Sequence, residues 1–160
     1  RRFRDLIMFQ WSTILDTLVS GKTSREDFPS YTPCADYLEF PKLRSWSPGK
    51  ISAEFVISEK YHNSRGHLFG GYFGVLADMT FCYTVMTVLK DEGYSTSDLR
   101  ITYFRPVMKG TLNIEGRVLH QSRKAVHVEA LFNDTDGRLV AKADGVMSIV
   151  PLSSIYPKRE

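Results

Sequence analysis

Apolar residues recur at helical spacing in two segments of the chain. Between residues 2 and 20 they fall every three or four positions and Gly21 follows as a stop signal, which predicts an amphipathic N-terminal helix. Residues 71–90 predict a second, longer helix closed by Gly93, in which Asp78 is the only charged residue before Lys90. A helix that is apolar on nearly every side must be buried on most of them.

Alternating apolar and polar residues predict strands before and after the second helix. Two precede it, over residues 36–40 and 51–57, and residues 21–34 indicate a loop rich in proline, serine and threonine. Four follow it, over residues 98–104, 111–119, 126–133 and 139–150. The Asp-Thr-Asp-Gly sequence at 134–137 predicts a hairpin between the last two. One long helix between early strands and a run of antiparallel strands predicts an α+β fold.

Both helices raise the question of a membrane. The second is long enough to span one, but glycine, threonine and tyrosine residues dilute its hydrophobicity, and Asp78 near its middle would be costly in lipid. We therefore predict a core helix wrapped by a curved sheet, with Gly71, Gly74 and Ala77 allowing close backbone approach. The arginines at the start of the N-terminal helix suit a membrane surface, but its acidic residues favour docking on its own domain or a partner subunit.

Composition and charge fit one soluble domain and exclude several function classes. The 160 residues are 42% hydrophobic and 24% charged, a balance typical of a single globular domain. Cys34 and Cys82 form no CxxC pair, which argues against a disulfide framework and favours a reduced, cytoplasmic setting. The net charge of +3 is spread along the chain, so it predicts no nucleic-acid arm but suits a small polyanionic ligand. His62 and His67 lack a third ligand, so we expect no metal site.

The carboxylate of Asp78 needs an explanation, because an unpaired buried charge is costly. One interpretation is a structural aspartate that caps a neighbouring loop, and the other is a general base or nucleophile whose pKa is raised by desolvation. The loop before the helix favours the second. The helix start after Gly70 and Gly71 presents free backbone N–H groups and a positive dipole end, and Asn63 adds an amide donor. These groups predict a corner that polarises a carbonyl group.

Several short motifs stand at fixed spacing around this corner. They are Asn63, Gly66, the Phe-Gly-Gly at 69–71, Asp78, and the run "TSDLRITYFRPVMKG" that begins with Thr96. Their arrangement resembles the hotdog-fold acyl-CoA thioesterases of the phenylacetate-pathway type. The pattern of that family is an Asn, a Gly three residues later, His-Gly-Gly, an aspartate on the central helix, and a Ser or Thr opening the next strand. The "DTDGRLVAKADGVM" segment also resembles the family's last hairpin.

The resemblance covers roughly residues 36–150 and implies a hotdog fold, an antiparallel sheet wrapped around a long central helix. It implies dimers that join sheets edge to edge, with sites at the dimer interface, and dimerisation would also protect an open sheet edge. Asp78 would activate water or attack the thioester, and Thr96 would help to hold the water. The Gly70 N–H and Asn63 would polarise the thioester carbonyl. Coenzyme A would enter only as part of the substrate, with no other cofactor.

The chain departs from the family pattern at Phe69, where the family has a histidine. His67 lies two residues earlier and is not a replacement by position, but it, Phe69 and Gly71 are candidates for substrate contact. Phe69 would then line an acyl pocket. Because the backbone donor at Gly70 survives the change, we expect reduced or altered activity rather than none.

Basic residues at strand ends are candidates for the phosphates of coenzyme A. Arg123 and Lys124 follow the strand turn where the family places nucleotide contacts, and they are the pair we favour. Arg105 and Lys109 are further candidates, although single charges of this kind are more often solvated strand ends.

These observations predict residues 1–34 as an N-terminal extension, 35–152 as a single hotdog domain and 153–160 as a tail. The predicted function is hydrolysis of acyl-CoA to a free acid and coenzyme A by a cytoplasmic homodimer or dimer of dimers, without a nucleic-acid or membrane partner. One alternative is an acyl-CoA binding or sensing module that has lost its chemistry with the histidine. Another is a hotdog dehydratase, which would need a histidine paired with a carboxylate. No GxSxG motif supports a serine triad.

Overall fold

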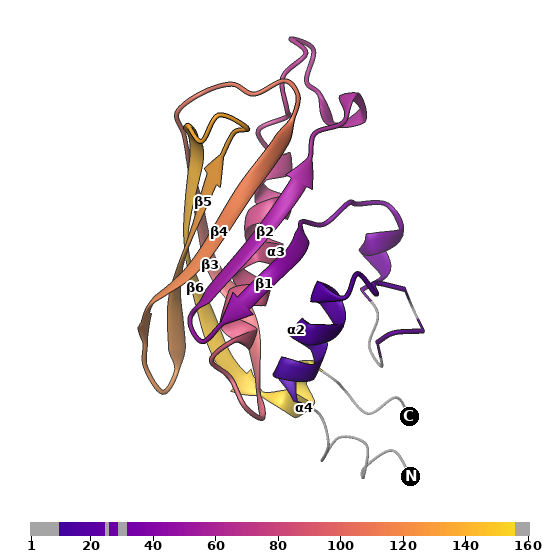
Figure 1. Cartoon of the computed structure of the whole chain (residues 1–160). Helices are drawn as coiled ribbons and strands as arrows, with labels where there is room; N and C mark the ends of the chain where they lie inside the picture. Colours follow the sequence, from indigo (N-terminus) through magenta and orange to yellow (C-terminus); the bar gives the residue numbers. More distant parts are fainter. Residues whose placement is uncertain (1–9, 25, 29–31, 156–160) are drawn as a thin grey trace.

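Six strands form one antiparallel sheet in the order β1-β2-β4-β5-β6-β3 (Figure 1). The computed structural model describes residues 10–24, 26–28 and 32–155. The strands are β1 (Lys42–Ser47), β2 (Lys50–Val56), β3 (Glu92–Tyr103), β4 (Thr111–Gln121), β5 (Ala125–Asn133) and β6 (Leu139–Pro151). The helices are α2 (Trp11–Val19), α3 (Tyr72–Met86) and α4 (Leu152–Ile155), with 3-10 turns at Pro33–Asp36 and Glu59–Tyr61. The long central helix against a curved antiparallel sheet confirms the predicted hotdog architecture.

Helix α3 packs into the sheet closely because two strands carry glycine where they meet it. A Cβ added to Gly116 of β4 would overlap the Thr84 side chain, and one added to Gly145 of β6 would overlap the Phe81 ring. The close approach that the sequence assigned to helix glycines is therefore made by strand glycines. At Gly74 the prediction was wrong, since a Cβ there would meet nothing within 4 Å.

The two edges of the sheet, β1 and β3, differ in what covers them. Helix α2 packs beside β1 (Figure 1), and the Trp46 indole of β1 donates a hydrogen bond to the Asp16 carboxylate at 2.8 Å. Trp11 and Leu15 of α2 are 2% and 0% exposed, so the apolar face of this helix is buried in its own domain. The N-terminal helix is confirmed over Trp11–Val19, and residues 2–9 of the prediction lie outside the described residues.

No helix in the described part of the chain is long and apolar enough to cross a membrane. Helix α3 ends at Met86, four residues before the predicted end, and Gly93 lies in β3 instead of closing the helix. Ten of the fifteen residues of α3 are buried, which confirms the prediction that this helix belongs to the core.

The start of the sheet differs from the sequence prediction. A strand was expected over residues 36–40, but Pro33–Asp36 forms a 3-10 turn with Pro33 at its first position. The first strand is β1, which the pattern missed because Leu43 is its only buried residue and a bulge interrupts it. β3 also begins at Glu92, six residues earlier than predicted, because the polar, exposed residues 95–97 interrupt the apolar alternation.

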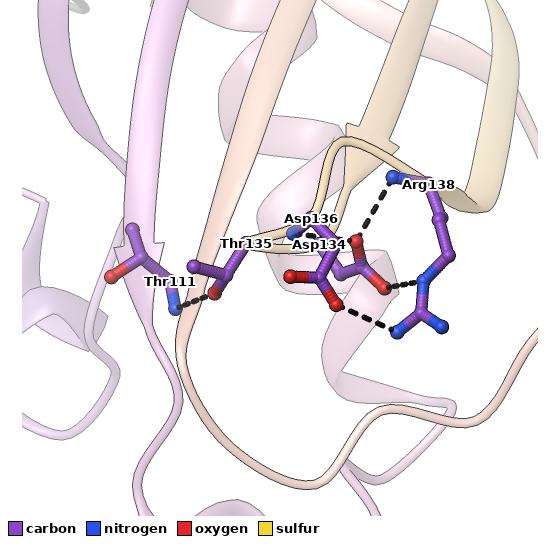
Figure 2. Close-up of polar contacts among 5 residues, drawn as sticks. All are labelled: Thr111, Asp134, Thr135, Asp136 and Arg138. Atoms are coloured by element: carbon purple, nitrogen blue, oxygen red, sulfur yellow. Dashed lines mark hydrogen bonds and ion pairs between the residues drawn. The ribbon is translucent and has the colours of Figure 1, made fainter.

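The predicted hairpin between β5 and β6 is confirmed, and one carboxylate organises its turn (Figure 2). Asp134 accepts hydrogen bonds from the backbone N–H groups of Asp136 (3.0 Å) and Arg138 (2.9 Å), and from Arg138 Nε at 2.8 Å. The bond from the Arg138 backbone is the main reason that the pKa of Asp134 lies below its usual value. Thr135 accepts a bond from the Thr111 N–H, which ties this turn to the start of β4.

The contact between Gly145 and Phe81 gives a test of the helix–sheet packing. Gly145→Ala would push a methyl group into the Phe81 ring, so we expect the free energy of unfolding in urea to fall by about 1–3 kcal/mol. Phe81→Leu should relieve part of this overlap, so the double variant should be more stable than the sum of the two single changes predicts, by about 1 kcal/mol. If the changes in the free energy of unfolding are strictly additive, the Phe81 ring does not restrict the size of the residue at position 145.

Candidate active site

The loop before α3 is a small hairpin shaped by Asn63. Its N–H donates to the His67 carbonyl at 2.8 Å, and its carbonyl accepts from the Gly66 N–H at 3.0 Å. Gly66 has φ +75°, a left-handed conformation that favours glycine. The Asn63 side-chain oxygen accepts from the N–H groups of Arg65 (2.9 Å) and His67 (3.2 Å). The side-chain oxygen is thus used by the loop, which leaves the amide nitrogen as the group able to donate to a ligand.

The start of α3 carries two free backbone donors. Tyr72, Phe73 and Gly74 donate their N–H groups back to the carbonyls of residues 69–71. Among the described residues, the N–H groups of Gly70 and Gly71 have no acceptor. Tyr103 of β3 donates its hydroxyl to the Gly70 carbonyl at 2.6 Å, which fixes this corner to the sheet. The corner therefore offers unsatisfied donors at the positive end of a buried helix, as predicted.

An open pocket of about 460 Å³ lies against this corner. It is lined by Asn63, Arg65, His67, Leu68, Gly70, Gly71, Phe73, Tyr103, Phe104, Arg105, Pro106 and Val107. Two arginines and a histidine belong to this lining and no acidic residue does, so the pocket suits an anionic or electron-rich group. Arg65 is not among the predicted site residues, although its position between Asn63 and Gly70 was a usable signal.

Asp78 forms a second polar centre on the same helix. Its carboxylate accepts a hydrogen bond of 2.6 Å from the hydroxyl of Thr96, which lies on the edge strand β3. Asp78 is half-buried and Thr96 is exposed. The two residues whose roles the resemblance connects are therefore in direct contact, and the second carboxylate oxygen of Asp78 is left for another partner.

Cys82 lies one turn beyond Asp78 and is not a second nucleophile. Burial and the negative charge of Asp78 raise the pKa of the Cys82 thiol to about 12. A thiol with a raised pKa stays protonated at neutral pH, and the protonated form is a poor nucleophile. Cys82 is therefore set aside as a nucleophile on this part of the helix.

Within one chain, the two polar centres do not meet. Gly70 and Asp78 are eight residues apart, which at the rise of an α-helix is about 12 Å along the axis. Neither Asp78 nor Thr96 lines the pocket beside Gly70. In a single chain, the predicted site residues therefore lie in two separate places, Asn63 and Gly70 in one and Asp78 and Thr96 in the other.

The remaining predicted residues divide between these places. His67 and Gly71 line the pocket, whereas Phe69 is 56% exposed and does not line it. The Phe69 ring lies against Gly71, since a Cβ added there would come within 2.6 Å of the ring. Phe69 therefore lies beside the free N–H of Gly71, at the surface where the helix begins.

Arg123 and Lys124 lie at the other end of the sheet, in the turn between β4 and β5 (Figure 1). The strand register connects this turn through Val126 and Met147 to Thr96, whereas the pocket lies at the Tyr103 end of β3. In one chain these two basic residues are therefore on the side of Asp78 and Thr96. The basic residues at the pocket itself are Arg65 and Arg105.

Known proteins resemble the chain over most of its core. Residues 65–141 match the family described as the thioesterase superfamily. A candidate esterase of Saccharolobus solfataricus is 33% identical over 104 residues, which are 65% of this chain and 74% of that protein. A hypothetical thioesterase of Streptococcus pneumoniae TIGR4, solved with coenzyme A, superimposes with a TM-score of 0.65 at 21% identity, over 69% of this chain and 86% of its own. A conserved protein of Pseudomonas aeruginosa superimposes with a TM-score of 0.68 at 26% sequence identity, over 79% of this chain and 99% of its own.

The environment of Cys82 predicts unequal reactivity of the two cysteines. At pH 8 the thiol of Cys82 should remain protonated, because its pKa is raised to about 12, while the exposed Cys34 should react with a thiol reagent such as DTNB. We expect one fast equivalent per chain in native protein and two in urea. Cys34→Ser should abolish the fast equivalent, and a fast reaction in that variant would show that Cys82 is accessible and ionised.

Proposed function

The chain belongs to the thioesterase superfamily, and from that premise we propose that it hydrolyses acyl-CoA thioesters to a free acid and coenzyme A. The observation that carries the proposal is the pair of polar centres, one at Asp78 within α3 and one in the turn that leads into this helix. One is a carboxylate held by Thr96, and the other is a set of free N–H donors at Gly70 and Gly71 beside Asn63. The related fold from Streptococcus pneumoniae was solved with coenzyme A, which supports this class of substrate.

Asp78 acts as the base in this proposal. Its carboxylate takes a proton from a water molecule, and the water oxygen forms a bond to the thioester carbonyl carbon. The carbonyl oxygen becomes an oxyanion that accepts hydrogen bonds from the Gly70 N–H and the Asn63 amide. When the oxyanion collapses, the carbon–sulfur bond breaks and the thiolate of coenzyme A takes up the proton. Each oxyanion donor of this kind contributes about 2.7–4 kcal/mol to lowering the barrier. Direct attack by Asp78 on the carbonyl carbon would use the same geometry.

Two copies of the chain are needed for this chemistry. Asp78 must contact the water and the Gly70 N–H must contact the oxygen of the same carbonyl group, but eight residues separate Gly70, in the turn before α3, from Asp78 in the same chain, about 12 Å at the rise of a helix. A site that combines Asn63 and Gly70 of one copy with Asp78 and Thr96 of a second copy removes the conflict. The open edge at β3 carries both Thr96 and Tyr103, one from each centre, so pairing through this edge brings the two centres together.

The basic residues then surround one substrate. Arg65, His67 and Arg105 line the pocket beside the oxyanion donors and attract the phosphates of coenzyme A. Arg123 and Lys124 lie on the Thr96 side of each chain, so those of the second copy approach the shared site. We place the activity in the cytoplasm because the two cysteines form no disulfide framework.

The binding module is the second candidate, and Phe69 is the observation that favours it. Its ring lies against Gly71, at the position where the phenylacetate-pathway type has a histidine. A protein of this kind would bind acyl-CoA and release no thiol. The dehydratase alternative has less support, because among the described residues no histidine contacts Asp78, and His62 is bound to the Met108 carbonyl at 2.7 Å.

The shared site predicts that two inactive variants restore each other. Asp78→Asn removes the base and Asn63→Ala removes a donor, so each alone should lower thiol release from acyl-CoA substrates by about a hundredfold or more. A mixed dimer keeps one intact site, built from Asn63 of one copy and Asp78 of the other. After the two variants are unfolded and refolded together, random pairing should return about a quarter of the parental rate.

Short, medium, long and aromatic acyl-CoAs should be tested with the parent chain first, and Asp91→Asn serves as an exposed carboxylate control. If Asp78→Asn releases thiol at the parental rate, Asp78 is excluded as the base. If Asp78→Asn and Asn63→Ala form mixed dimers but thiol release does not recover, a shared site would be excluded. Acyl-CoA binding without thiol release from any substrate would establish the binding module.

A further inference from the structure

Strand β3 contacts both polar centres, although the two residues that do so are an odd number of positions apart. Thr96 donates its hydroxyl to the Asp78 carboxylate at 2.6 Å, and Tyr103 donates its hydroxyl to the Gly70 carbonyl at 2.6 Å. These two residues of β3 are seven positions apart. Successive side chains of a regular strand point to opposite faces, so residues seven positions apart would lie on opposite faces. An uninterrupted strand could therefore not contact both centres.

A β-bulge at Ser97 resolves this conflict. In the pairing with β6, Thr96 lies opposite Met147 and Asp98 lies opposite Val146, so Ser97 has no opposite residue. A bulge of this kind inserts one extra residue into a strand and can re-aim a side chain beside it. The side chains that face α3 are therefore even-numbered before the bulge and odd-numbered after it: Tyr94 and Thr96, then Leu99, Ile101 and Tyr103.

The bulge decides which of two neighbouring hydroxyl groups faces α3. Leu99 and Ile101 pack against the core, which fixes the orientation of the second half of β3. If the pairing were regular through residue 97, the alternation would turn Ser97 toward α3 and Thr96 away from it. With the bulge, Thr96 faces α3, and its hydroxyl also lies 3.5 Å from the sulfur of the fully buried Met147.

Ser97 is held on the other face of the sheet by Ser148 of β6. The hydroxyl groups of the two serines share a hydrogen bond. Ser148 lies on the face away from α3, because it follows Met147, which is fully buried and lies opposite Thr96. A serine that is bound there cannot face the helix at the same time, so this bond favours the bulge over regular pairing.

Resting on the proposed hydrolase function, we propose that Ser97 and Ser148 are positioning residues for the reaction. Their hydrogen bond holds the bulge, and the bulge keeps the hydroxyl of Thr96 on the carboxylate of Asp78. Both serines lie on the face of the sheet away from Asp78, so they act through Thr96 and do not contact the reacting atoms. A carboxylate that is oriented by Thr96 presents its second oxygen to the attacking water.

Removal of either hydroxyl tests the proposal by the kinetics of the best acyl-CoA substrate of the parent chain. Ser97→Ala and Ser148→Ala should each lower kcat about fivefold, the worth of one hydrogen bond, and leave KM unchanged. The double variant should lose no more than either single one, because the two hydroxyls form one bond. Ser148→Thr keeps a hydroxyl and should retain the parental kcat. Ser95→Ala is the matched control, since Ser95 is exposed and lies opposite Ser148 but outside the bulge. Parental kcat in both alanine variants of the pair would overturn the proposal.

A Thr96→Val background separates positioning from a general effect on stability. Thr96→Val removes the hydroxyl through which the bulge acts, so Ser97→Ala should lower kcat no further in that background. A merely structural role of Ser97 would lower kcat by the same factor with or without the Thr96 hydroxyl. An unchanged fivefold loss in the Thr96→Val chain would therefore overturn the positioning role.

A disulfide tests the bulge without any assay of hydrolysis. In a Cys34→Ser background, Ser97→Cys combined with Ser148→Cys should form a disulfide within one chain, because the two side chains are in contact on one face of the sheet. Mass spectrometry of the denatured protein detects the bond, and Ser97→Cys alone, treated with the same oxidant, is the control. Oxidation should return kcat to the parental value, since the disulfide locks the bulge, and reduction should lower it. If the folded double variant forms no disulfide, Ser97 does not face Ser148 and the proposal fails.

Failure of the positioning role and failure of the proposed function give different results. If the parent chain hydrolyses acyl-CoA and the alanine variants of Ser97 and Ser148 match it, the positioning role fails and the hydrolase stands. If the parent chain releases no thiol although the disulfide between positions 97 and 148 forms, the hydrolase is excluded, and the positioning role falls with it while the bulge remains.

Discussion

The rise of an α-helix is the constraint on which this structure depends. Gly70 lies in the turn that leads directly into α3 and Asp78 lies within that helix, so their separation, about 12 Å at the rise of a helix, is not closed by a change of rotamer. Packing makes the helix rigid, since Thr80, Phe81 and Thr84 are fully buried against the sheet. The proposed reaction needs both ends of this segment at one carbonyl group, so it would draw them from two chains.

The sequence predicted the central helix and the late strands well, because each carries a strong apolar period and ends at a clear turn. It failed at β1 and at the start of β3, and both failures have one physical cause. Edge strands bury few residues: Leu43 is the only buried position of β1, and Gly93 is the only buried position of β3. The prediction that helix glycines allow the close approach was also wrong. The residues that let α3 approach the sheet are Gly116 and Gly145 of the strands, and sequence alone does not place them opposite the helix.

The sequence predicted the parts of the candidate site whose residues are close together in the chain. It did not predict the parts whose positions depend on how the strands pair in the sheet. The free donors at Gly70 and Gly71 follow from a helix start, and the contact between Asp78 and Thr96 agrees with the family spacing. The position of Arg123 and Lys124 depends on strand register, and only the fold shows that they lie away from the pocket of their own chain. Arg65 was overlooked because a single arginine in a loop carries no periodic signal, and only its position between Asn63 and Gly70 marks it.

The most direct test of the central claim is the rate of thiol release per chain across the dimer–monomer equilibrium. The best acyl-CoA substrate of the parent chain would be assayed over protein concentrations at which sedimentation shows dimers giving way to monomers. A site shared between two copies predicts that the rate per chain falls in proportion to the fraction of dimer. A rate per chain that stays constant while the dimers dissociate would contradict it, because each chain would then hold a complete site.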